Sequence, residues 1–149
     1  MATAASTRLL SWSAARGRQV AWGPMQLLDT ALAGLEARLH AHQLDAAFAR
    51  EALAFGARSE PDLPRDWRLL IVVTPSPAHA VTFDTSAGRL DALLPPTYVS
   101  YRASFETMRR ELSGGPLAGA QVRTVDGPLK SIASALGLAR YGRSNVTYA

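Results

Sequence analysis

Asp126 is the side chain best suited to acid–base chemistry in this sequence. It lies in the run Val125-Asp126-Gly127-Pro128, between a segment that alternates like a strand and one spaced like a helix. Ligands of α/β sheets bind at such junctions, where a carboxyl group with a pKa raised by desolvation can act as a general acid. The same carboxylate could instead cap the helix and accept backbone N–H groups, which lowers its pKa. Position alone leaves both roles open.

The three histidines do not have the spacing of a metal site. His40 and His42 are two residues apart on a predicted helix, so they point to different sides and cannot bind one ion together. His79 stands alone in a proline-bounded turn. The sequence also lacks the HExxH, Walker A and GxSxG patterns of zinc proteases, P-loop proteins and α/β-hydrolases. We therefore expect no metal site.

Composition limits the class of protein. The chain has 149 residues, of which 48% are hydrophobic and none is cysteine. We expect one globular domain with no disulfide and no cysteine-bound cluster of its own. No apolar run approaches the ~20 residues that span a bilayer, so we expect no membrane association. Arginine supplies fifteen of the sixteen basic residues and a formal charge of +4, which suits an anionic partner but is explained more simply by solvated helix faces.

Residues 1–23 form a basic leader that we expect to be disordered. They contain arginine but no acidic residue, and they are rich in alanine and serine. This composition is shared by organellar transit peptides and by frayed leaders, and the second reading is the simpler one. Residues 24–149 then form the folded domain, which we expect in the cytoplasm.

Patterning along residues 24–149 predicts alternating helices and strands. Apolar spacing predicts helices over residues 24–41, 44–55, 98–112 and 128–136, and strands over residues 68–74, 80–84 and 121–125. The strand over residues 68–74 is unbroken and β-branched, which is typical of a central strand buried on both faces. Glu106 is expected to pair with Arg110 one helical turn later, and Gly137 to end the last helix in a left-handed conformation. The predicted fold is an α/β (α+β) sandwich with a small central sheet flanked by helices.

The most specific motif lies near the end of the sequence. It comprises Leu129-Lys130-Ser131-Ile132-Ala133 and then Gly137-Leu138-Ala139-Arg140-Tyr141-Gly142-Arg143-Ser144-Asn145. The two runs resemble the segment "LK…A…GL…YGRNN" that closes the amino-terminal domain of the epoxyqueuosine reductase-like family of proteins with two [4Fe–4S] clusters. The likeness extends over roughly residues 67–149, including Leu93-Leu94-Pro95-Pro96-Thr97-Tyr98.

This resemblance implies a corrinoid-binding oxidoreductase. The family holds cobalamin against its amino-terminal domain, and the resemblance places Gly142, Arg143 and Asn145 nearest the corrinoid. Gly142 and Asn145 could instead only supply turn conformations. Asp126 matches the aspartate that donates a proton in the enzymes that modify tRNA. The sequence spacing between Asp126 and Gly137 is shorter than in those enzymes. This shorter spacing favours a branch of the family with another substrate. It leaves the catalytic role of Asp126 and a tRNA partner open.

The cysteine-rich cluster module of the family has no counterpart in this sequence. The resemblance therefore implies an incomplete, truncated or split domain that requires an iron–sulfur module in trans and is not active as an oxidoreductase alone. The alternative is a non-catalytic remnant, or a module that binds a small molecule or a protein and keeps the fold without the chemistry.

Overall fold

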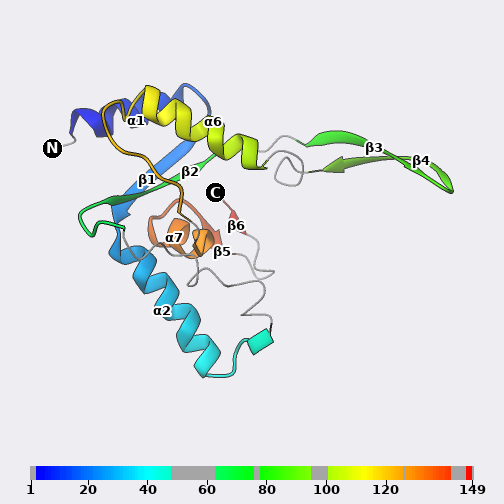
Figure 1. The fold of residues 1–149 in the computed structure, drawn as a ribbon, viewed down its shortest axis with the longest axis horizontal. Helices are drawn as coiled ribbons and strands as arrows, with labels where there is room; N and C mark the ends of the chain where they lie inside the picture. Colours follow the sequence, from blue (N-terminus) through cyan, green and yellow to red (C-terminus); the bar gives the residue numbers. More distant parts are fainter. Residues whose placement is uncertain are drawn as a thin grey trace. The chain divides into compact units, whose positions relative to one another are not determined.

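The computed structural model divides the chain into two compact units. It describes residues 3–47, 63–75, 78–94, 101–125, 127–141 and 147–148. Unit 1 comprises residues 1–18 and 74–124, and unit 2 comprises residues 19–73 and 125–149. Figure 1 follows the chain through the helices and strands of both units. Each unit is described separately below.

Unit 1 begins with helix α1 (Ala4–Ala14). The Thr3 hydroxyl caps the helix by accepting a hydrogen bond from the backbone N–H of Ser6 at 3.3 Å. Leu9 and Trp12, three residues apart, lie on one face and are buried. The described part of residues 1–23 is therefore folded, with α1 and strand β1 in place of the expected disorder. The composition of residues 1–23, rich in alanine, serine and arginine, did not reveal the Thr3 cap or the buried pair Leu9 and Trp12.

Helix α6 (Tyr101–Gly114) also belongs to unit 1. It confirms the helix predicted over residues 98–112, although residues 98–100 lie outside the described part. Leu112 is buried near its carboxyl end. The predicted pair of Glu106 with Arg110 is wrong, because Glu106 accepts from Arg109 at 2.8 Å instead. Arg110 turns to the backbone oxygen of Glu106, at 3.4 Å.

Strands β3 (His79–Thr85) and β4 (Gly88–Leu94) form an antiparallel hairpin in unit 1. A two-residue turn joins them, and Gly88 directly after it has a φ of +124°, which favours glycine. The strand predicted over residues 80–84 is confirmed, whereas β4 was not predicted. Phe83 lies opposite Leu90 on one face, and both side chains are exposed.

Unit 2 contains strand β1 (Gln19–Pro24) paired antiparallel with strand β2 (Arg68–Val73). The register runs from Gln19 opposite Val73 to Pro24 opposite Arg68. Strand β2 confirms the strand predicted over residues 68–74, but not the predicted burial of that strand on both faces. Leu69 is its one buried residue, and the four residues that follow are half-buried. Among the described residues β2 pairs with β1 alone, so it is not a central strand.

Two helices complete the core of unit 2. Helix α2 (Gln26–His40) and helix α7 (Leu129–Ala135) confirm the helices predicted over residues 24–41 and 128–136. Helix α7 contacts α2 and β2. The buried core consists of Met25, Leu28, Leu69 and Ile132, so it draws on both helices and on β2. Most of the helix predicted over residues 44–55 lies outside the described residues.

The segment predicted as a strand over residues 121–125 is not one. Its apolar residues Val122 and Val125 are half-buried, but among the described residues no strand lies beside it to complete a ladder of hydrogen bonds. Alternation of apolar and polar residues over five positions was therefore insufficient to predict a strand. Packing rather than pairing holds this segment, and Val125 contacts the core of unit 2.

The chain is a mixed α+β protein, which confirms the predicted class. The described strands pair in twos, as β1 with β2, β3 with β4, and β5 (Arg140–Tyr141) with β6 (Thr147–Tyr148). None of the helices in the described ranges has both the length and the apolar composition needed to cross a membrane.

Candidate functional site

The predicted acid, Asp126, lies outside the described residues, but both of its neighbours are in unit 2. Val125 is half-buried against the core, and Gly127 is buried. A Cβ atom added at Gly127 would lie 2.9 Å from Leu28 Cδ1. This close approach excludes a larger residue without a shift of the core. The backbone on both sides of residue 126 is thereby held against α2 and α7.

The start of helix α7 bears on the two roles considered for Asp126. The N-cap position is occupied by Pro128, and no side chain caps it by a hydrogen bond. The backbone N–H of Leu129 donates to the oxygen of Gly127 at 2.8 Å. Residue 126 lies two positions before Pro128. Asp126 is therefore not the N-cap residue of α7.

Helix α7 ends as predicted, on a glycine with left-handed backbone. Gly137 has a φ of +73°. The N–H of Leu138 donates to the oxygen of Ala133 at 2.9 Å, and that of Gly137 donates to the oxygen of Ser134 at 3.0 Å. These bonds satisfy carbonyl groups of the last turn and redirect the chain. Strand β5 begins three residues later and contacts α7.

The predicted corrinoid contacts Gly142, Arg143 and Asn145 also lie outside the described residues. They belong to the connection between β5 and β6. Arg140 pairs with Tyr148, and Tyr141 pairs with Thr147. The residues on either side of positions 142–146 are thus joined by antiparallel pairing in unit 2, the unit that also contains the neighbours of Asp126.

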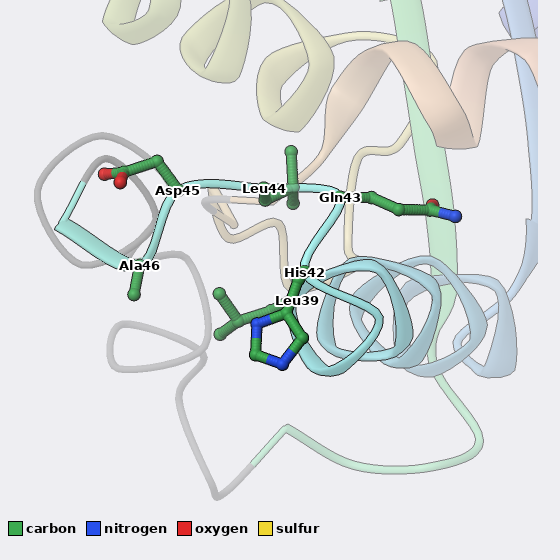
Figure 2. Close-up of a pocket in the computed structure, with 6 residues that line it drawn as sticks. All are labelled: Leu39, His42, Gln43, Leu44, Asp45 and Ala46. Atoms are coloured by element: carbon green, nitrogen blue, oxygen red, sulfur yellow. The ribbon is translucent and has the colours of Figure 1, made fainter.

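An open depression lies at the carboxyl end of α2. Its lining residues are Leu39, His42, Gln43, Leu44, Asp45 and Ala46. Figure 2 shows the Asp45 carboxylate away from the His42 imidazole, so the two do not form an acid–base pair. His42 has a φ of +54°, and its N–H donates to the oxygen of Leu39 at 3.1 Å. These residues therefore form the end cap of α2.

A second depression lies in unit 1, between α1 and the turn after α6. It is lined by Thr7, Arg8, Ser11, Trp12, Arg16, Gly115 and Pro116. The lining combines two guanidinium groups and two hydroxyl groups with the apolar side chains of Trp12 and Pro116. No acidic side chain is among the lining residues. This cluster was not found from the sequence. The recurrence of Arg8, Trp12 and Arg16 every four residues is the signal that could have revealed it.

Ionisable groups elsewhere are dispersed. No group of three or more histidine, cysteine, aspartate or glutamate side chains in the described part of the chain could hold a metal ion. The hydrogen bond and the charge from Arg109 hold the pKa of Glu106 below its ordinary value. In unit 2, Arg65 forms an exposed ion pair with Asp29.

The chain was compared with protein-family models, with curated proteins and with solved structures, and none of them matches it.

Proposed function

We propose that this chain is the corrinoid- and substrate-binding part of an iron–sulfur oxidoreductase similar to the epoxyqueuosine reductases, acting in the cytoplasm. The observation that carries the proposal is the motif over residues 129–145. The described part of this motif is a helix, a left-handed glycine and the first strand of a hairpin. That arrangement supports the proposal because the residues that the resemblance assigns to the corrinoid fall, in sequence, between the paired strands β5 and β6.

In this proposal, Gly142, Arg143 and Asn145 hold the corrinoid. The periphery of cobalamin carries amide groups and a phosphate. Arginine and asparagine side chains are N–H donors suited to such oxygens, and glycine permits close approach of the backbone. The donor chemistry of the three residues therefore fits the cofactor. Cobalamin would supply a redox-active metal centre, and Asp126 would deliver a proton to the substrate.

The clusters of the family do not fit this chain. Iron–sulfur clusters are held mainly by cysteine thiolates, and the sequence contains no cysteine. Electrons must therefore come from an iron–sulfur module outside this sequence.

Titration with hydroxocobalamin, followed by its visible absorbance, tests the proposal. We expect a saturable spectral change with the unmodified chain and a weaker affinity with Arg143→Gln. The matched control is Arg140→Gln, which removes the same charge from the paired strand β5. Absence of a spectral change, or equal losses in the two variants, would rule out a corrinoid site at residues 142–145.

A second candidate is a binding module without redox chemistry. The observation that favours it is the apolar face of the β3–β4 hairpin, where Phe83 is 42% exposed and Leu90 57% exposed. Isolated hairpins are marginally stable, so such a face gains from a covering partner. A chain that binds no corrinoid but pulls down a defined partner, and loses it on Leu90→Ser, would favour this candidate.

A further inference from the structure

The depression of unit 1 between α1 and the turn after α6 has the chemistry of an anion site. It has a volume of about 450 Å³. Thr7 and Arg8 lie on the same side of α1 as Ser11, because they precede it by four and three residues. Their side chains, with that of Arg16, offer hydroxyl and guanidinium N–H donors. Buried Trp12 and Pro116 provide the apolar part of the lining.

The Nε atom of Arg8 is held by a hydrogen bond, and its two Nη groups are available to a ligand. Its Nε atom donates to the backbone oxygen of Pro116 at 3.2 Å. This bond links Arg8 of α1 to Pro116, and both residues line the depression. The two Nη groups make no hydrogen bond to a described residue. A guanidinium held in this way keeps the paired donors that bind two oxygens of one phosphate.

The charge of Arg16 is only partly neutralised, because Arg16 shares one carboxylate with Arg18. Glu111 contacts both Arg18 and Arg16, but its oxygen lies 2.7 Å from Arg18 Nη1 and 3.4 Å from Arg16 Nε. The shorter contact goes to Arg18, whose side chain is only 16% exposed. One carboxylate therefore serves two arginines, and Arg16 is the weakly held one. Together with Arg8, the cluster carries an excess of positive charge.

Trp12 adds to the excess of donors. Arg16 and Arg18 lie over its indole ring, with the guanidinium carbons 5.4 and 4.8 Å from the ring centroid. Its Nε1 atom is buried and makes no hydrogen bond in the described part of the structure. Buried donors of this kind are rare in folded proteins. The indole is therefore a largely buried part of the lining, beneath two guanidinium groups.

We infer that this depression binds the phosphate group of a small organic phosphate ester, with the organic part against Trp12 and Pro116. Arg8, Arg16 and Ser11 would donate to the phosphate oxygens. The inference does not depend on the proposed corrinoid site, because all of its residues belong to unit 1. Phosphate is favoured over a single-charged anion because two guanidinium groups line the site and no carboxylate does.

Phenyl phosphate is the probe, because it combines a phosphate with an apolar ring. We expect the indole N–H resonance of Trp12 in a ¹⁵N-labelled chain to shift saturably during the titration at constant ionic strength. The resonances of Trp22 and Trp67, which belong to unit 2, should not move. Inorganic phosphate should shift the same resonance with weaker affinity. Equal affinities would overturn the assignment to an ester, and shifts that do not saturate would overturn the site.

Two substitutions and one control locate the site. Arg8→Gln should weaken phenyl phosphate binding by about tenfold or more, since it removes a charge-assisted contact. Ser11→Ala, at an exposed helix position that tolerates alanine, should weaken binding about fivefold. Arg38→Gln removes one positive charge from α2 in unit 2 and should leave the affinity unchanged. An equal loss with Arg38→Gln, or full affinity with both Arg8→Gln and Ser11→Ala, would contradict the inference.

Discussion

Arg18 and Glu111, 93 positions apart in the sequence, form an ion pair of 2.7 Å in unit 1. The contact joins the residue that ends the first segment of the unit to helix α6. Arg18 also lies over the ring of Trp12. The pair is one of the long-range polar contacts that hold α1 and α6 together, alongside the bond from Arg8 to Pro116.

Replacement of Glu111 by glutamine should destabilise the protein. It leaves the largely buried Arg18 guanidinium without a counter-charge, which we expect to lower the free energy of unfolding by about 1–2 kcal/mol. The matched control is Glu106→Gln on the same helix, where the partner Arg109 is exposed. We expect little or no change in the free energy of unfolding there, because exposed ion pairs contribute little. Urea unfolding curves of both variants provide the measurement, and equal effects would show that burial does not strengthen the Arg18 pair.

The carboxyl group of Glu106 should titrate below its ordinary pKa. Its hydrogen bond with Arg109 and the positive charge of that residue favour the ionised form. Because the folded pKa is lowered, the stabilisation is present above the ordinary pKa and disappears as the pH falls through the folded value. NMR titration of the side-chain carboxyl carbon should show the pKa of Glu106 rising in Arg109→Gln. An unchanged pKa in that variant would contradict the pairing.

Gly127→Ala should destabilise unit 2. The added Cβ would lie 2.9 Å from Leu28 Cδ1, and Leu28 is buried in the core. Overpacking of this kind costs about 1–3 kcal/mol. Gly34→Ala is the control, because nothing lies within 4 Å of its Cβ position in α2, and alanine there should stabilise by about 0.5–1 kcal/mol. Thermal unfolding should shift in opposite directions, and a neutral Gly127→Ala would refute the close approach.

His42→Gly should stabilise the end of α2. His42 has a left-handed backbone with a φ of +54°, and glycine adopts this conformation without steric cost. We expect a gain of about 0.5–1 kcal/mol. Two residues earlier, His40 is the last residue of α2, so His40→Gly should instead destabilise by a similar amount. Chemical denaturation of the two variants gives the answer, and a loss with His42→Gly would exclude relief of backbone strain.

The sequence predicted elements where apolar spacing was strong. Helices α2 and α7 follow from regular apolar residues with glycine or proline at their ends, and β2 follows from an unbroken β-branched run. Strand β4 was missed although Arg89, Leu90 and Asp91 alternate in polarity, because it contains no β-branched residue. Alternation at residues 121–125 failed because a strand requires a partner, which a local pattern does not reveal.

The candidate functional residues also differ in whether the sequence alone could predict them. Gly137 could be predicted, because a left-handed glycine after a helix is a local property. The cluster around Trp12 could not, because it depends on Glu111 and Pro116, which approach α1 only in the folded chain. The predicted residues Asp126, Gly142, Arg143 and Asn145 lie outside the described residues, so their roles remain those of the proposal.

Equilibrium dialysis of the intact chain against hydroxocobalamin tests the central claim most directly. We predict saturation at about one corrinoid per chain, with retention reduced in Arg143→Gln and preserved in Arg140→Gln. The Glu111→Gln variant, altered in unit 1, should also retain the corrinoid wherever it remains folded. Failure of the unmodified, folded chain to concentrate the corrinoid would contradict the account.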